Sequence, residues 1–186
     1  MANFVLVHGG YQGAWIWKPT VQCLLAAGHS VHAPTLDGCA ERRDQLRPGI
    51  TVSTQAREVA DLLFYEDIPD AILVGTSFGG MVISKAAELA RARLGQNSVK
   101  HLVYVDALAP QPGETCADIV VRDPNRPYNR LELSQGPTPD DMENRLFADF
   151  EPDLRAWAVA RYTLHPNGGT DAEPGELDNF WSQSWS

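Results

Sequence analysis

The sequence has no apolar run that approaches the roughly 18 residues a helix needs to span a membrane. It also has no basic run, and 24 acidic against 15 basic side chains give a formal net charge of −9. Nucleic acids and anionic membranes are bound through clustered positive charge, so neither is an expected partner. The N-terminus shows no charged leader followed by an apolar segment and a cleavage site, and we therefore expect a cytoplasmic protein.

Cysteine is scarce, and nucleotide-binding loops are missing. Cys23, Cys39 and Cys116 are odd in number and widely spaced, which indicates reduced thiols and neither a disulfide framework nor a metal site. The glycines at 9–13 do not have the spacing of a dinucleotide fingerprint, and no Gly-Lys-Ser/Thr sequence follows them. We therefore expect no metal and no organic cofactor.

The chain is organised around residues 71–80, Ala-Ile-Leu-Val-Gly-Thr-Ser-Phe-Gly-Gly. The apolar first half predicts a buried strand, and residues 78–93 contain helix-forming residues and no proline. Ser77 would then lie on a tight turn between a strand and a helix, which exposes its hydroxyl as a nucleophile. Gly75 and Gly79 are needed there, because a Cβ atom at either position would collide with a neighbouring strand or helix.

A second glycine-rich segment, His8 to Gly13, follows the first predicted strand at 4–7. Its glycines let the backbone approach a ligand closely and offer N–H groups to it. The N–H of Gly10 and that of Phe78, the residue after the nucleophile, would form an oxyanion hole near the positive end of the helix dipole. His8 is expected to brace this loop and not to act as a base, because a base must reach the serine hydroxyl.

Strands and helices alternate along residues 1–106, which predicts an α/β fold with a doubly wound, mostly parallel sheet. The other helices and strands expected in this core are at 18–27, 30–36, 51–65 and 99–105. The polar segment 39–49 is interpreted as a solvated surface loop. Active sites of such sheets lie at the carboxyl ends of strands, where Gly10, Ser77 and Asp106 all fall.

Residues 107–186 have a different composition, because prolines interrupt them repeatedly. Only short helices are predicted, at 138–147 and 152–164. We expect this region to be a helical lid over the strand ends, which would exclude water and shape the substrate site. The residues expected to line the substrate pocket are Gly9, Tyr11 and Trp157.

Four segments carry a family resemblance. They are Phe-Val-Leu-Val-His-Gly-Gly-Tyr-Gln-Gly-Ala-Trp-Ile-Trp at 4–17, Ala-Gly-His-Ser-Val at 27–31, Leu-Val-Gly-Thr-Ser-Phe-Gly-Gly at 73–80 and Tyr-Val-Asp-Ala-Leu-Ala-Pro at 104–110. On these motifs the chain resembles the α/β-hydrolase family, in the branch of plant methyl esterases, hydroxynitrile lyases and bacterial carboxylesterases that include pyrethroid hydrolases. The resemblance implies Ser77 as the nucleophile and the N–H groups of Gly10 and Phe78 as the oxyanion hole. Lyases of this branch carry a hydroxyl residue where this chain has Gly9, which favours ester hydrolysis.

In this family the catalytic acid and histidine follow strands that come after the lid, and Ser186 stands where the first of those strands is expected. A serine hydroxyl is a poor nucleophile without a base. A C-terminal segment or a separate chain could supply both groups and complete the fold, which agrees best with the order nucleophile, acid, histidine. Alternatively, Asp106 and His165 act as substitute acid and base, or the chain only binds ligands.

The sequence thus predicts a serine carboxylesterase that cleaves a small, moderately apolar ester or lactone through an acyl-enzyme on Ser77. A non-catalytic ligand-binding protein and a hydroxynitrile lyase are the alternatives. The expected partners are the small-molecule substrate, the polypeptide segment that completes the fold and a second copy of the chain, which an edge strand or the lid could contact.

Overall fold

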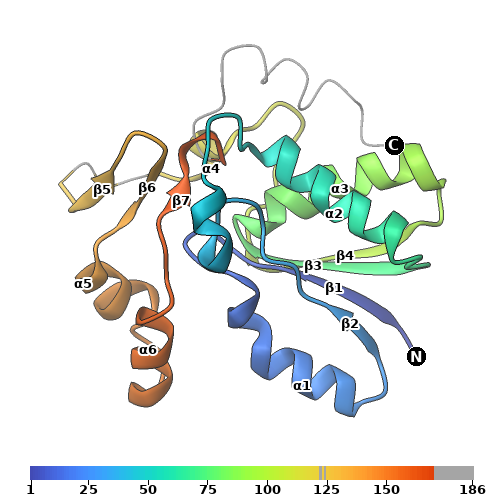
Figure 1. Ribbon diagram of the computed structural model, residues 1–186, viewed down its shortest axis with the longest axis horizontal. Coiled ribbons are helices and arrows are strands. Elements are labelled where there is room, and N and C mark those ends of the chain that lie inside the picture. The colour runs from blue at the N-terminus through green and yellow to red at the C-terminus, as the bar shows by residue number, and fades with distance from the viewer. Residues whose placement is uncertain (122, 124, 170–186) are drawn as a thin grey trace.

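A computed structural model describes residues 1–121, 123 and 125–169 (Figure 1). Its central sheet has four strands in the order β2 (Ser30–His32), β1 (Asn3–Val7), β3 (Ala71–Ser77) and β4 (Val99–Ala107). All three neighbouring pairs are parallel. The parallel sheet predicted from the alternation of strands and helices is therefore confirmed, and β4 lies at one edge of it.

Helices cover both faces of this sheet (Figure 1). α1 (Lys18–Ala26) lies on one face, whereas α2 (Val52–Tyr65) and α3 (Gly79–Leu94) pack against each other on the opposite face. α2 begins at Thr51, whose hydroxyl oxygen accepts a hydrogen bond from the Thr54 N–H at 3.2 Å. No helix in the described part of the chain has the length and apolar character needed to cross a bilayer.

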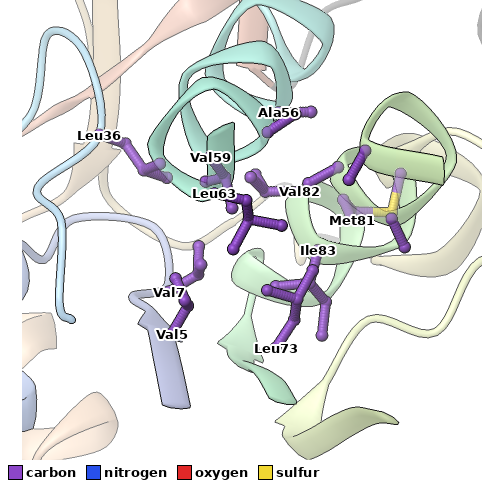
Figure 2. Close-up of a cluster of buried hydrophobic side chains, with 14 of the residues drawn as sticks. Val5, Val7, Leu36, Ala56, Val59, Leu63, Leu73, Met81, Val82 and Ile83 are labelled. Carbon is purple, nitrogen blue, oxygen red and sulfur yellow. The ribbon is translucent and has the colours of Figure 1, made fainter. Parts of the chain in front are cut away.

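The main core lies between the sheet and the helix pair α2 and α3. Figure 2 shows apolar side chains from β1, β3 and both helices meeting there. Those that are almost completely buried include Val5, Val7, Leu63, Leu73, Val82 and Ile83. A smaller apolar cluster on the other face packs β1 and β3 against α1 and the 3-10 helix η1 (Ala14–Trp17) that precedes it.

Two segments of the first half differ from the prediction. β2 ends at His32 and does not reach Leu36, because Pro34 has no N–H to donate to a neighbouring strand. Part of the expected solvated loop forms the 3-10 helix η2 (Ala40–Gln45). The buried carboxylate of Asp37 holds this segment in place, since it accepts hydrogen bonds from Arg47 at 2.7 and 3.1 Å.

The described part of the expected lid, residues 107–169, lies mostly beside the carboxyl ends of the central strands (Figure 1). It contains the short helices α4 (Cys116–Ile119), α5 (Pro139–Asp141), η3 (Met142–Leu146), α6 (Pro152–Val159) and η4 (Asn167–Gly169). It also contains an antiparallel sheet that the sequence did not predict, formed by β5 (Tyr128–Arg130), β6 (Ser134–Pro137) and β7 (His165–Pro166). The predicted helix at 152–164 is shorter than expected, and residues 170–186 of the expected lid lie outside the described residues.

At the turn between β3 and α3, backbone segments lie so close together that no side chain fits between them. Ser77 has a φ of 49°, a left-handed conformation that costs a non-glycine residue on the order of 1–3 kcal/mol. A Cβ atom on Gly75 would lie 2.6 Å from the carbonyl oxygen of Gly79. One on Gly79 would lie 2.5 Å from the carbonyl oxygen of Val7. The prediction that both positions need glycine is confirmed.

His8 braces the glycine-rich loop from inside the protein. Its side chain is fully buried, its Nε2 atom accepts a hydrogen bond from the Leu36 N–H at 3.0 Å, and its Nδ1 atom lies 2.8 Å from the Gly9 carbonyl oxygen. Nδ1 therefore carries the proton and donates it to that carbonyl. Burial lowers the pKa of His8 to about 4.

We expect Gly79→Ala to lower the free energy of unfolding by about 2–4 kcal/mol, because the new methyl group would press against the carbonyl oxygens of Val7 and His8. Gly10→Ala is the matched control, since its methyl group would meet Phe78 Cβ at an ordinary contact distance of 3.9 Å. Urea unfolding of both variants measures the difference. Equal stability of the two variants would contradict the proposed close approach.

Acid should destabilise the protein through His8. Unfolded histidine takes up a proton near pH 6.5, but the buried His8 does so only near pH 4. The unfolded state therefore binds more protons between these values, and the free energy of unfolding should fall by up to about 3 kcal/mol as the pH decreases through this window. Urea titrations at pH 7 and 4.5 test this: His8→Gln should reduce the loss, and His29→Gln, which changes a half-buried histidine, should not.

Candidate active site

Ser77 lies at the carboxyl end of β3, where the strand turns into α3. Its side chain is exposed, as the sequence predicted, and its hydroxyl has no hydrogen-bond partner among the described residues. The amino-terminal end of α3 follows directly, and its dipole favours negative charge on a bound oxygen atom. The turn therefore presents a free alcohol beside a positive helix end.

The glycine-rich loop lies directly against this turn. A Cβ atom built on Gly9 would come within 2.8 Å of Ser77 Cβ, and one on Gly10 would lie 3.9 Å from Phe78 Cβ. The Gly9 N–H donates to the side-chain oxygen of Gln12 at 3.1 Å, which fixes the loop. In the described part of the chain, the N–H groups of Gly10 and Phe78 donate no hydrogen bond. The two predicted oxyanion donors thus belong to adjacent backbone segments and are both available.

Asp106 lies at the carboxyl end of β4, next to the turn that holds Ser77. Thr76 pairs with Val105 and Ser77 with Ala107, so Asp106 is an extra residue in a bulge opposite Ser77. It has a φ of 44°, and its side chain is exposed and makes no ion pair with the described residues. Two strained residues therefore stand side by side at this edge of the sheet.

His165 lies on β7 of the antiparallel sheet and is almost completely buried. Its Nδ1 atom is 3.6 Å from the sulfur of Cys39, and its ring packs edge-on against that of Phe78, with centroids 4.6 Å apart. Its Nε2 atom has no partner. Burial, with a smaller contribution from His8, lowers the pKa of His165 to about 3.

The structure therefore does not assemble Asp106 and His165 into a substitute triad with Ser77. Neither ring nitrogen of His165 is hydrogen-bonded to the serine hydroxyl or to the Asp106 carboxylate. A histidine with a pKa near 3 would also hold the serine proton poorly. His165 instead packs against the ring of Phe78 and lies beside the sulfur of Cys39.

The buried thiol of Cys39 is not a second nucleophile. Burial raises its pKa to about 12, so the reactive thiolate is not formed near neutral pH. The sulfur contacts the Asp37 carbonyl oxygen and the Gln55 amide nitrogen at 3.7 and 3.8 Å. Within the described residues, no three histidine, cysteine or acidic side chains gather as a metal site would require.

Tyr11 and Trp157, both expected at the substrate pocket, take part in contacts between the N-terminal half of the chain and the region after β4. The Tyr11 hydroxyl lies 2.8 Å from that of Tyr128 on β5. Trp157 on α6 packs edge-on against Trp15 with ring centroids 5.3 Å apart, and the Arg161 guanidinium lies over its ring. Tyr11 thus lies next to the site, whereas Trp157 joins the aromatic cluster that attaches α6 to η1.

Sequence reasoning missed the segment before β7, which joins the glycine-rich loop and η2. The Thr163 N–H donates to the Tyr11 carbonyl oxygen at 3.0 Å, and the Thr163 hydroxyl accepts from the Ala40 N–H at 3.0 Å. The proline after His165 indicates only where β7 ends. These contacts join residues far apart in the sequence, so no local pattern could have predicted them.

Comparison with known proteins identifies relatives for most of the chain. The carbendazim hydrolyzing esterase of Nocardioides sp. strain SG-4G is 39% identical over 115 residues, which are 62% of this chain and 46% of that protein. The pyrethroid hydrolase of Sphingobium wenxiniae is 31% identical over 152 residues, 81% of this chain and 51% of that protein. The α-hydroxynitrile lyase of Arabidopsis thaliana is 35% identical over 58% of this chain and 40% of that protein. The chain spans about half the length of these relatives or less.

Solved structures share the fold. The tomato methylketone synthase I superposes with a TM-score of 0.76 over 98% of this chain and 73% of that one, at 22% identity. The polyneuridine aldehyde esterase gives a TM-score of 0.72 over 89% of this chain and 69% of that one, at 23% identity. The sequence model of the alpha/beta hydrolase family matches residues 4–183. With its parallel sheet and its serine turn between β3 and α3, the chain belongs to the alpha/beta hydrolase family.

Proposed function

We propose that this chain carries the nucleophile and the oxyanion hole of a serine hydrolase that cleaves small carboxylic esters or lactones. The observation that supports it best is the meeting of two backbone segments. The exposed Ser77 stands on a strained turn, and the glycine-rich loop lies so close to it that Gly9 has no room for a side chain. This arrangement fits acyl transfer, in which an alcohol attacks a carbonyl and nearby amides stabilise the resulting charge.

The reaction would proceed through an acyl-enzyme. A base takes the proton of Ser77 as the hydroxyl oxygen bonds to the ester carbonyl carbon, and the carbonyl oxygen becomes an anion. The N–H groups of Gly10 and Phe78 would bind this anion, assisted by the dipole of α3. The tetrahedral intermediate then collapses, the alcohol leaves with the proton from the base, and water releases the acid from Ser77 by the same two steps.

The base must come from outside the described residues. Both buried histidines of the region, His8 and His165, have pKa values that burial lowers to about 4 and about 3. His8 also uses both ring nitrogens for backbone hydrogen bonds. We therefore propose that a further polypeptide segment, on a longer chain or a separate one, supplies the catalytic histidine and its acid. No metal or organic cofactor takes part in this mechanism.

Relatives support an ester as the substrate class. An esterase and a pyrethroid hydrolase are among the matched proteins, although a hydroxynitrile lyase is matched as well. A lyase of this branch carries a hydroxyl side chain at the position of Gly9, where any Cβ atom would lie 2.8 Å from Ser77 Cβ. The backbone therefore favours hydrolysis over cyanohydrin cleavage. The cytoplasmic location remains a prediction, because the matched relatives include ones named as chloroplastic.

A ligand-binding protein without catalysis is the second candidate. It is favoured by one observation: in the described part of the chain, no base is bonded to the Ser77 hydroxyl. The two candidates share the same site and differ in the reactivity of Ser77, which a covalent probe measures directly.

We expect a fluorophosphonate probe to modify Ser77, and added imidazole to accelerate the reaction because a free base can replace the missing one. Peptide mass spectrometry locates the adduct. Ser77→Ala should remove it completely, whereas Ser53→Ala on α2 should leave the rate unchanged. A chain that resists labelling with and without imidazole, yet binds small esters, would be the ligand-binding protein.

The oxyanion role of Gly10 can be tested with two variants. Gly10→Ala keeps the N–H, and its methyl group meets no atom closer than 3.9 Å, so labelling should be nearly normal. Gly10→Pro removes the N–H and should slow imidazole-assisted labelling by on the order of 10²–10³-fold. Melting temperatures of both variants separate this effect from misfolding. Equal labelling rates in two folded variants would exclude Gly10 as a donor.

A further inference from the structure

Tyr11 bends the glycine-rich loop directly after Gly10. Its φ is 68°, in the left-handed region that a residue with a side chain rarely adopts. Among residues 8–13, all of which the structure describes, no other has a positive φ. A glycine would take this conformation freely, yet the chain has a tyrosine at the bend. Such a conformation persists only where surrounding contacts hold it.

A tyrosine in this conformation has a simple way to relax. Rotating the peptide group between Gly10 and Tyr11 by about half a turn brings the φ of Tyr11 to a negative value. The rotation needs a matching change in the ψ of Gly10, which a glycine allows at little cost. It would reverse the Gly10 carbonyl and readjust the neighbouring peptide group, which carries the Gly10 N–H. The direction of this N–H therefore depends on what holds Tyr11.

The Gly9 end of the loop is held from the core. The Gly9 N–H donates to the side-chain oxygen of Gln12 at 3.1 Å, and the Gly9 carbonyl oxygen lies 2.8 Å from Nδ1 of the buried His8. Both peptide groups of Gly9 are thus fixed. These two contacts do not include Tyr11, which is held from another direction.

The region after β4 holds Tyr11 at three points. The Tyr11 carbonyl oxygen accepts a hydrogen bond from the Thr163 N–H at 3.0 Å, just before β7. The Tyr11 hydroxyl lies 2.8 Å from that of Tyr128 on β5. A Cβ atom on Gly136 of β6 would lie 3.0 Å from Cδ1 and Cε1 of the Tyr11 ring, so the ring packs directly on the strand. Main chain, ring and hydroxyl are therefore all fixed.

Thr163 also secures the end of the glycine-rich loop. Its hydroxyl accepts a hydrogen bond from the Ala40 N–H at 3.0 Å. Ala40 has a φ of 41° and packs so closely on the loop that a Cβ atom on Gly13 would lie 2.4 Å from its own Cβ. One residue thus contacts two left-handed residues, Tyr11 and Ala40, that come from different parts of the sequence.

We propose that Tyr11 is a positioning residue for the reaction at Ser77. The antiparallel sheet keeps Tyr11 in its left-handed conformation, and this conformation directs the N–H of Gly10. The part in catalysis rests on the proposed function, in which that N–H binds the oxyanion. The coupling between the sheet and Gly10 does not. Tyr11 acts through Gly10 and needs no contact with the reacting atoms.

A direct contact between Tyr11 and the substrate is the competing role. Losing such a contact would weaken binding, whereas a misdirected donor lowers the maximal rate, because the oxyanion forms only in the transition state. Tyr128 separates the two roles. Tyr128→Phe removes the hydroxyl that supports Tyr11 and leaves every atom of Tyr11 present.

Nuclear magnetic resonance of the 186-residue chain with ¹⁵N-labelled glycine observes Gly10 directly, and Gly10→Ala identifies its signal. We expect Tyr128→Phe to shift the Gly10 amide resonance and to broaden it by exchange between two loop conformations. Gly136→Ala should affect the same signal, since its methyl group would press on the Tyr11 ring. Tyr65→Phe on α2 is the matched control, because that side chain is 73% exposed and distant in the fold.

Imidazole-assisted fluorophosphonate labelling of Ser77 measures the consequence. Tyr11→Phe and Tyr128→Phe should each lower the maximal rate at least about fivefold and leave the half-saturating probe concentration unchanged. The double variant should lose no more than either single one, because both remove the same pair. In the Gly10→Pro background, which lacks the N–H, Tyr128→Phe should lower the rate by less than about twofold.

Three results would overturn the proposal: a Gly10 resonance that Tyr128→Phe leaves unmoved, a rate loss that persists in full with Gly10→Pro, or a loss confined to probe binding. Circular dichroism and melting temperatures verify that each variant is folded. The resonance also separates this proposal from the hydrolase function. A shifted Gly10 signal in a chain whose Ser77 stays unreactive would uphold the coupling and contradict the hydrolase.

Discussion

The site depends on backbone-to-backbone contact around Ser77 that leaves no space for Cβ atoms. Gly75, Gly79 and Gly80 would each bring a Cβ atom within 2.6 Å of a carbonyl oxygen, from α3, β1 and the segment after β4 in turn. β1, β3, α3 and the segment after β4 thus pack closely against one another at this turn. Ser77 can keep its strained φ because this packing leaves the turn no other conformation.

The same contacts explain how much the sequence could predict. Gly75 and Gly79 flank Ser77 two residues away on each side, so the need for glycine there could be inferred from the local pattern. β1, β3, α2 and α3 were predictable for a similar reason, because each carries a continuous apolar run or a periodic apolar face. The position of the glycine-rich loop against the turn followed from the parallel arrangement, which brings strand ends together.

What the sequence could not show depends on contacts between distant residues. Asp37 is buried and forms ion pairs with Arg42 and Arg47, which tie the mostly exposed segment after it to the rest of the protein. The antiparallel sheet of β5, β6 and β7 has strands of two to four residues, too short for a periodic signal. His165 looked like a candidate base by its order in the chain, but its strand turns its ring toward Cys39 and Phe78.

The protonation state of the two buried histidines near Ser77 limits what they can do. Burial keeps His8 and His165 neutral, so both act through shape and hydrogen bonds and neither can exchange protons with a substrate near pH 7. The base that the proposed mechanism needs would have a higher pKa, as expected of a histidine in a more polar environment or one paired with a carboxylate. The exposed carboxylate of Asp106 lies beside Ser77, at the carboxyl end of the edge strand β4. The exposed carboxylate and the edge strand that carries it, as far as the structure describes the sheet, therefore lie on the same side of Ser77.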